Sequence, residues 1–226
     1  MQNAASTLLA NIQFSNVDKP IRTINVTSSV PNDGKTTVAT SLAIAVCATG
    51  KNILIIEGDF RRRSLRHMLD AKGGRGIYSL LSGSCSYKDA IVKTSIKHLD
   101  FLDAEAGINN PNGILSSKRF GKMLETLKEN YSLIIIDTPP LTAFPDAAII
   151  ASKTDGTILV CRQDYTDISE AEYSIEQLSN AHANLLGVVM NGITDDTGRH
   201  SYYYNYYYSN SHGERSYNQN SRLKNK

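Results

Sequence analysis

Residues 28–37 combine the residue types that bind phosphate groups. They read SSVPNDGKTT and lie between an apolar run and a helix-type pattern. Gly34 lets backbone N–H groups approach phosphate oxygens closely, and a helix beginning here would add free donors. Lys35 would reach the β- and γ-phosphates, while the Thr36 hydroxyl would bind Mg²⁺. The segment therefore predicts a phosphate-binding loop of the form G-x-x-x-x-G-K-[ST], in which Ser29 replaces the first glycine.

A carboxylate ends a second apolar run. Residues 132–140 read SLIIIDTPP, so Asp137 directly follows the run and two prolines prevent its extension. An Asp at the end of a strand is as often a turn or helix-cap residue when it stands alone. Together with the phosphate-binding loop, it predicts a ligand that helps to hold Mg²⁺ at a nucleotide.

Two carboxylates follow a third apolar run. Residues 52–63 read NILIIEGDFRRR. Side chains two residues apart point to the same side of an extended segment, so we expect Glu57 and Asp59 to face one metal–phosphate site. One would hold Mg²⁺ and the other would accept a proton from a hydroxyl group. Arg61 and its neighbours would add positive charge. The plainer alternative is a solvent-exposed strand end of mixed charge.

These motifs need a scaffold that brings strand ends together. Apolar or β-branched runs alternate with helix-type patterns along residues 21–193. The predicted strands are 23–27, 52–56, 99–102, 132–136, 157–161 and 186–190, and the predicted helices are 36–48, 117–130, 146–153 and 169–182. This alternation predicts an α/β fold with a doubly wound, mostly parallel sheet and helices on both faces. Such sheets bind ligands at the carboxyl ends of their strands, where the motifs lie.

Charge and hydropathy narrow the function classes. The 226 residues carry a net charge of only +2, which argues against a nucleic-acid binder. The sequence has no apolar run of about 18 residues. Its N-terminus lacks the pattern of a signal peptide, so we expect a cytoplasmic protein. We divide it into an N-terminal helical segment at 1–20, a P-loop domain at 21–198 and a tail at 199–226.

The tail differs in composition from the rest of the chain. Residues 199–226 carry a net charge of +4 and hold seven of the twelve tyrosines but a single aliphatic residue, which predicts a flexible segment. Its tyrosines would stack on nucleic-acid bases, form an adhesive low-complexity segment or accept phosphate. A nucleotide site in the same chain favours phosphate acceptance. The candidate acceptors are Tyr202, Tyr203, Tyr204, Tyr206, Tyr207, Tyr208 and Tyr217.

These features resemble a known family. The segments SSVPNDGKTT, ILIIEGDFRRR and LIIIDTPP, with a tyrosine-rich C-terminus, are similar to those of the bacterial tyrosine kinases of capsule and exopolysaccharide synthesis. These are the BY-kinases, here in their stand-alone Gram-positive form. The resemblance implies a P-loop fold, ATP and Mg²⁺ as cofactors, and phosphoryl transfer to tyrosine, including autophosphorylation of the tail.

The resemblance also implies roles for individual residues. Those that would bind ATP are Ser29, Asp33, Gly34, Lys35, Thr36, Thr37 and Asn191, the last at the adenine. Those that would hold Mg²⁺ are Thr36, Asp59 and Asp137. Those that would take part in transfer are Lys35, Glu57, Asp59 and Arg61.

The resemblance implies partners as well. A membrane-bound activator, whose cytoplasmic end completes the active site, would recruit the kinase to the inner face of the membrane, and a cognate phosphatase would reset the tail. The family often carries Glu-x-x-Arg-x-x-Arg near its N-terminus and uses it to pack a ring of subunits. Those positions here are Asn3, Ser6 and Leu9, so a homo-oligomer would need other contacts, such as apolar ones from an N-terminal helix.

A second departure from the family keeps two other functions open. The family has an aspartate at the position of Glu57, and moving a carboxylate by about 1 Å can cost about 100-fold in rate. A non-catalytic, nucleotide-sensing regulator is therefore one alternative. The other is a positioning ATPase of the MinD/ParA type, although that group carries a lysine where this chain has Val30.

Overall fold

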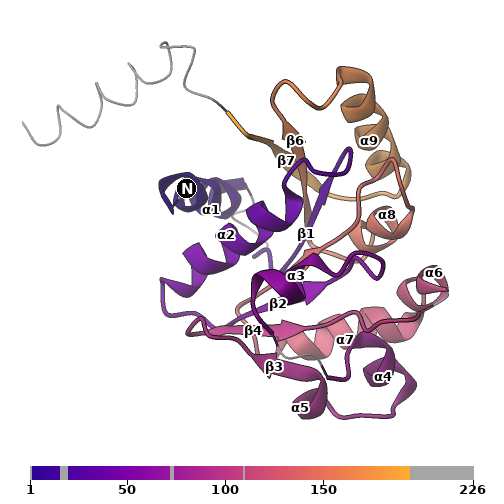
Figure 1. Cartoon of the computed structure of the whole chain (residues 1–226). Coiled ribbons are helices and arrows are strands. Elements are labelled where there is room, and N and C mark those ends of the chain that lie inside the picture. Colours follow the sequence, from indigo (N-terminus) through magenta and orange to yellow (C-terminus); the bar gives the residue numbers. More distant parts are fainter. Residues whose placement is uncertain (1, 16–19, 72–73, 109, 194–226) are drawn as a thin grey trace, which may run out of the picture. The chain divides into compact units, whose positions relative to one another are not determined.

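Short apolar and β-branched runs form the strands of one sheet (Figure 1). The strands are β1 (Thr23–Ser28), β2 (Ile53–Glu57), β3 (Ile91–Lys93), β4 (Leu99–Leu102), β5 (Leu133–Asp137), β6 (Gly156–Arg162) and β7 (Leu185–Asn191). Their order across the described part of the sheet is β3-β4-β2-β5-β1-β6-β7. All neighbouring strands are parallel except β3, which runs antiparallel to β4.

Helices cover both faces of this sheet. They are α1 (Gln2–Ser15), α2 (Lys35–Cys47), α3 (Ser64–Met68), α4 (Ile77–Ser82), α5 (Tyr87–Ala90), α6 (Pro111–Leu115), α7 (Lys118–Lys128), α8 (Asp146–Ala151) and α9 (Ile168–Asn180). Successive strand residues point to opposite faces, so each face gains its own apolar core. Ile53 and Ile55 pack with residues of α1, α2 and α3, whereas Leu54 and Ile56 pack with residues of α4, α7 and α8.

This architecture confirms the predicted fold class, and each predicted strand has its counterpart in the sheet. The structure adds β3 and the short helices α3, α4, α5 and α6, which lie in the region between residues 64 and 115. These elements have only three to six residues, too few for a hydrophobic period to show in the sequence.

The structure describes residues 2–15, 20–71, 74–108 and 110–193. Residues 1–191 form one compact unit, in which α1 packs on α2 and buries Ile12 in the core. The predicted tail from residue 199, with all seven candidate acceptor tyrosines, lies outside the described residues. Within the described ranges, no helix has the length and apolar character needed to cross a membrane.

Candidate active site

The carboxyl ends of β1, β2 and β5 meet at one edge of the sheet. β5 lies between β1 and β2 and pairs with both, so the segments that follow these three strands become neighbours. A cavity of about 470 Å³ opens there, and Lys35, Thr36, Asp59 and Arg61 contribute to its lining. The fold therefore brings together residues from motifs that are separated in the sequence.

The loop between β1 and α2 depends on a left-handed glycine. Gly34 has a φ of 95°, and a Cβ atom at this position would lie 2.0 Å from Nδ2 of Asn191. Only glycine satisfies both the dihedral angle and the lack of space. α2 begins at the next residue with no acidic side chain in its first turn, and Lys35, Thr36 and Thr37 line the cavity. The positive end of the helix is thus placed to bind phosphate.

Side chains within and beyond the loop hold its shape. The fully buried Asp33 carboxylate accepts hydrogen bonds from the backbone N–H of Val30 (2.9 Å) and from the hydroxyl of Thr166 (2.7 Å). Asn191 donates through Nδ2 to the carbonyl oxygen of Asp33 (2.8 Å). These bonds make Asp33 and Asn191 supports of the loop. Their predicted contacts with ATP, including that of Asn191 with adenine, stay predictions.

Two further contacts fix the start of the loop at Ser29, and a third orients Thr166, which holds Asp33. Ser29 is fully buried and its hydroxyl lies 3.5 Å from Sγ of Cys161. Its carbonyl accepts a hydrogen bond from the Thr142 hydroxyl (2.7 Å). The Thr166 hydroxyl accepts one from the backbone N–H of Arg162 (2.7 Å). Sequence reasoning missed Thr142 and Thr166, because each lies more than 100 residues from the loop and belongs to no motif.

Lys35 links the two carboxylates predicted to serve Mg²⁺. Its ammonium nitrogen lies 3.6 Å from a carboxylate oxygen of Asp59 and 3.6 Å from one of Asp137. The Thr36 hydroxyl donates a hydrogen bond to the other oxygen of Asp137 at 2.6 Å. None of these four residues is more than 9% exposed. Their charges therefore interact in surroundings of low dielectric, where electrostatic forces are strong.

The two carboxylates that follow β2 have different surroundings. Oδ1 of Asp59 accepts hydrogen bonds from the backbone N–H groups of Arg61 (3.1 Å) and Arg62 (2.9 Å), and Oδ2 lies toward Lys35. The fully buried Glu57 instead accepts hydrogen bonds from the backbone N–H groups of Asp59 (3.2 Å) and Leu65 (2.8 Å). Glu57 thus turns toward the N–H groups of Asp59 and Leu65, while Asp59 faces Lys35. Both lie near Lys35, and their predicted shared metal–phosphate site stays a prediction.

Burial changes the acid–base behaviour of this group. Burial, reinforced by the nearby Asp137, raises the pKa of Glu57 to about 9. Burial also raises the pKa of Asp137 to about 6, against the opposing effects of Lys35 and the Thr36 hydroxyl. Independently of these shifts, Lys35 brings one positive charge to the carboxylates of Asp59 and Asp137, and a divalent cation would supply further positive charge.

The residues present fit a bound Mg²⁺. Oδ1 of Asp137 is buried and has no hydrogen-bond partner, and the Thr36 hydroxyl lies beside the same carboxylate. Among the described residues, no group of three or more His, Cys, Asp or Glu side chains is arranged as a metal site. Mg²⁺ does not require one, because it is usually held by one or two carboxylates with water and substrate phosphates. Thr36 and Asp137 would hold the ion, with Asp59 nearby.

Arg61 is fixed at the rim of the cavity by two contacts. Its guanidinium lies 3.8 Å from the centre of the Phe144 ring and forms an ion pair with Asp146. Asp146 is fully buried at the start of α8, where burial raises its pKa and Arg61 acts to lower it. Sequence reasoning missed both partners. The only sign of Asp146 was its position as the first residue of a predicted helix.

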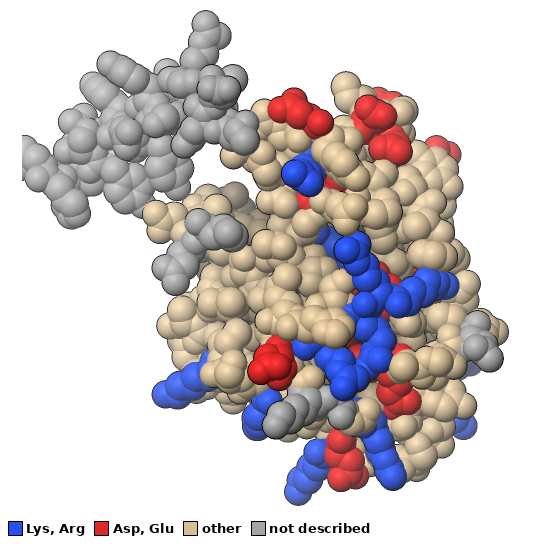
Figure 2. Space-filling view, viewed as in Figure 1, with Lys and Arg blue, Asp and Glu red and all other residues tan. Residues whose placement is uncertain are grey.

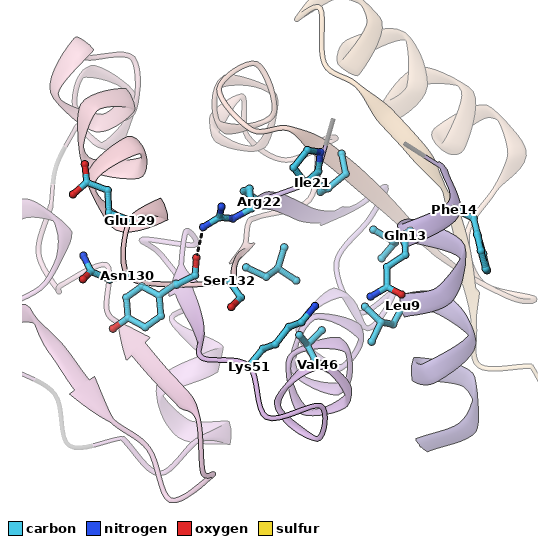
Figure 3. A pocket seen from close by; sticks show the side chains of 14 residues that line it. Leu9, Gln13, Phe14, Ile21, Arg22, Val46, Lys51, Glu129, Asn130 and Ser132 are labelled. Atoms are coloured by element: carbon cyan, nitrogen blue, oxygen red, sulfur yellow. Dashed lines mark hydrogen bonds between the residues drawn. The ribbon is translucent and has the colours of Figure 1, made fainter. Parts of the chain in front are cut away.

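A larger cavity lies at the opposite, amino-terminal edge of the sheet. It measures about 750 Å³ and is lined by residues of α1, the segment just before β1 and the turn before β5. Figure 3 shows Leu9 of α1 on one side, Glu129 and Asn130 on the other, and Arg22 between them. The Arg22 guanidinium donates a hydrogen bond to the carbonyl of Tyr131 (2.8 Å). The motif at 132–140 contributes only its first two residues, Ser132 and Leu133, and none of the predicted site residues lines this cavity.

Comparison with known proteins decides the family. The family model described as AAA domain matches residues 21–185. The chain is 33% identical over 186 residues to tyrosine-protein kinase YwqD of Bacillus subtilis, which covers 82% of this chain and 78% of that protein. It is 33% identical over 197 residues to tyrosine-protein kinase CpsD of Streptococcus agalactiae, with 87% and 85% covered. The chain belongs to the bacterial tyrosine-protein kinases. This confirms the family that the three motifs indicated.

Solved kinase structures share the fold. The chimeric protein CapA2B2 matches this kinase with a TM-score of 0.79 at 32% identity, over 84% of this chain and 83% of the other. The kinase domain of Escherichia coli tyrosine kinase ETK matches with a TM-score of 0.83 at 25% identity, over 87% and 77%. MinD of Pyrococcus horikoshii, solved with Mg-ADP, reaches 0.65 at 22% identity and shares the fold alone.

Proposed function

We propose that this kinase uses ATP and Mg²⁺ to phosphorylate the tyrosines of its own residues 199–226. The observation that carries the proposal is that Lys35, Thr36 and Asp59 line one cavity and that Lys35 and Thr36 both contact the buried Asp137 behind it. The relatives that share this sequence are named tyrosine-protein kinases. The tail offers seven phenol groups as acceptors.

Each part of the site would serve one part of the transfer. The bond between the γ-phosphorus and its bridging oxygen breaks, ADP leaves with the electron pair, and a new bond forms to the phenol oxygen. Lys35 and the loop N–H groups would stabilise the charge on the transferring group. Asp59 would orient the phenol and accept its proton, because it lines the cavity. The Glu57 carboxylate would position Asp59 by accepting a hydrogen bond from the Asp59 backbone N–H. Mg²⁺, when bound, neutralises phosphate oxygens.

Transfer would take place between neighbouring subunits. About 20 residues of a flexible chain span roughly 25 Å on average, and Tyr202 follows Asn191, which contacts the phosphate loop, by only 11 residues. We therefore expect so short a connection to present its tyrosines to a neighbouring copy rather than to turn back into its own site. A mixing experiment tests this. A full-length Lys35→Ala chain is incubated with an active chain that ends at residue 198. Phosphotyrosine on the Lys35→Ala chain supports transfer between subunits, and its absence, while the truncated chain phosphorylates an added tyrosine peptide, contradicts it.

Phosphorylation of the tail would regulate capsule or exopolysaccharide synthesis and export. Each phosphotyrosine adds about −1.5 to −2 charge, so seven would change a tail of +4 to roughly −6 to −10. An acidic partner or an anionic membrane surface that attracts the unmodified tail would then repel it. A membrane-bound activator would recruit the kinase, other copies of the chain would supply the acceptors, and a phosphatase would reset the tail.

One incubation separates the proposed kinase from its two alternatives. The purified full chain is given labelled ATP and Mg²⁺, with and without the cytoplasmic peptide of its activator. Phosphotyrosine supports the kinase. Release of phosphate without phosphotyrosine supports an ATPase of the MinD type, and neither product supports a nucleotide sensor.

A further inference from the structure

Four arginines gather beside the cavity. Arg61, Arg62, Arg63 and Arg66, here called the rim arginines, lie between the end of β2 and the middle of α3. Figure 2 shows Lys and Arg side chains in a band down the face on which α3 lies in Figure 1. Two of them, Arg61 and Arg62, line the cavity itself. The acceptor tyrosine must therefore approach past a basic surface.

Carboxylates neutralise only part of this positive charge. Asp146 pairs with Arg61, and Asp103 is shared by Arg63 and Arg66, the latter at 3.7 Å. Two carboxylates thus form ion pairs with three of the four guanidinium groups, and Glu57 and Glu105 also act on Arg63.

Arg62 is the most available of the four. It is exposed, and its guanidinium donates a hydrogen bond to the neutral Asn32 side-chain oxygen at 3.1 Å. In the part of the chain that the structure describes, no carboxylate forms an ion pair with it. Its charge can therefore act on an approaching anion, as can that of Arg66, which lies 3.7 Å from the Asp103 carboxylate that it shares with Arg63.

The acceptor segment lacks the negative charge that would attract it to the rim arginines. Residues 201–211 read SYYYNYYYSNS and contain no acidic residue, while the tail as a whole carries +4. An unmodified tail is therefore repelled by the rim. Within this segment the one available source of negative charge is phosphate on another tyrosine, and each of its six tyrosines has a tyrosine directly beside it. Arginine binds phosphate through paired, charge-assisted hydrogen bonds.

We propose that the rim arginines bind an anionic group next to the acceptor tyrosine, so that a tail carrying one phosphotyrosine is a better substrate than an unmodified tail. This inference rests on the proposed function and names the substrate class of that site. The first phosphate on a tail is added slowly, and the adjacent tyrosines follow faster. Arg62 contributes most, and Arg66 supports it.

Peptides with defined charge test the proposal. The full-length kinase, with its activator's cytoplasmic peptide, is given peptides of residues 201–210 that are unmodified, phosphorylated at Tyr207, or changed by Tyr207→Asp. We expect kcat/KM for the phosphopeptide to exceed that for the unmodified peptide about tenfold, chiefly through KM, since its phosphate would gain charge-assisted hydrogen bonds that the unmodified peptide lacks. The aspartate peptide should fall between them. This arm separates recognition of phosphate from recognition of any negative charge.

Variants assign the preference to the rim. Arg62→Gln should reduce the preference to about threefold or less, and Arg62→Gln with Arg66→Gln should abolish it. Lys51→Gln, which removes an exposed cation at the opposite edge, is the matched control and should keep it. High ionic strength should weaken the preference of the enzyme without substitutions for the phosphopeptide. This measurement does not depend on how well a variant folds.

Three results would overturn the proposal. One is equal kcat/KM for the phosphorylated and unmodified peptides, and another is a preference that survives the double variant. The third is a raised KM for ATP in the arginine variants with an unchanged peptide preference, which would mean that the rim serves the nucleotide. Absence of transfer to every peptide would instead refute the proposed kinase activity, and this inference with it.

Discussion

The two edges of the sheet carry cavities of different character. The amino-terminal cavity is the larger, at about 750 Å³ against about 470 Å³, and mixes apolar residues of α1 with exposed polar ones such as Lys51. The smaller cavity is lined by the buried Lys35 and Asp59, and the Lys35 ammonium lies 3.6 Å from Asp59 and 3.6 Å from the buried Asp137 behind the lining. Convergent buried charge beside a glycine turn, rather than volume, therefore identifies the site of chemistry.

Polar groups at the amino-terminal edge serve the fold instead. The Asp155 carboxylate accepts hydrogen bonds from the backbone N–H groups of Arg22 (3.0 Å) and Thr23 (2.8 Å) and from the Thr23 hydroxyl (2.9 Å). These bonds tie the residue before β6 to the start of β1. Substitutions should therefore reduce activity at one edge and stability at the other.

Loss of the phosphate-loop lysine should have the largest effect. Lys35→Ala removes the cation between Asp59 and Asp137, and we expect tyrosine phosphorylation to fall at least about 100-fold. Lys51→Ala is the control, because it removes an exposed lysine of the amino-terminal edge. Phosphotyrosine is measured by mass spectrometry. Equal losses in both variants would contradict the difference between the edges.

Substitution of Asp59 should affect mainly activity, whereas substitution of Glu57 should affect mainly stability. Asp59→Asn should lower kcat about 100-fold with little change in the free energy of unfolding, since Asp59 faces the cavity. Glu57→Gln should lower the free energy of unfolding by about 1–3 kcal/mol, because an amide has one oxygen for two backbone N–H groups. Kinetics and urea unfolding provide the two measurements. A loss of stability in Asp59→Asn but not in Glu57→Gln would contradict this assignment of activity to Asp59 and stability to Glu57.

The loop glycine should control nucleotide affinity. Gly34→Ala places a Cβ atom against Asn191 and strains a residue with φ of 95°, so we expect ATP to bind about tenfold more weakly, measured by calorimetry. Adding Asn191→Ala removes the clash but leaves the strain of about 1–2 kcal/mol, and should restore only part of the affinity. Unchanged affinity in Gly34→Ala would show that the loop does not hold the nucleotide.

The smallest effect on transfer is expected at Asp155. Burial alone would raise its pKa, but hydrogen bonds from Arg22 and Thr23 and the Lys128 ammonium outweigh burial and lower the pKa below its usual value. The carboxylate therefore stabilises the fold above the unfolded-state pKa of about 3.9, and this contribution is lost as pH falls through the lower folded-state pKa. Asp155→Asn should lower the free energy of unfolding by about 1–3 kcal/mol at pH 7 and by progressively less in acid, with transfer retained. A pH-independent difference would contradict this assignment.

The sequence predicted the parts of the site that are local. Asp137 ends β5, and Lys35 and Thr36 begin α2 after the short loop that follows β1; parallel strands place such ends at one edge. The same reasoning did not identify the hydrogen-bond partners of Glu57, because spacing gives the direction of a side chain but not the partners it will find. Two backbone N–H groups hold Glu57, one of them at Leu65 in a helix too short to predict.

The remaining support of the site came from segments without a motif. Thr166 reaches the phosphate loop from the connection between β6 and α9, and Asp146 reaches Arg61 from α8. Each contact joins residues at least 85 apart, so neither periodicity nor local spacing contains it. Such partners follow only from the packing of the strands.

Mass spectrometry of the tail tests the central claim most directly. The full chain is incubated with ATP, Mg²⁺ and its activator's cytoplasmic peptide, and residues 199–226 are mapped for phosphate. We expect phosphate on the tyrosines between residues 202 and 208, and none when Lys35→Ala replaces the active chain. An unmodified tail after ATP has been consumed would contradict the account.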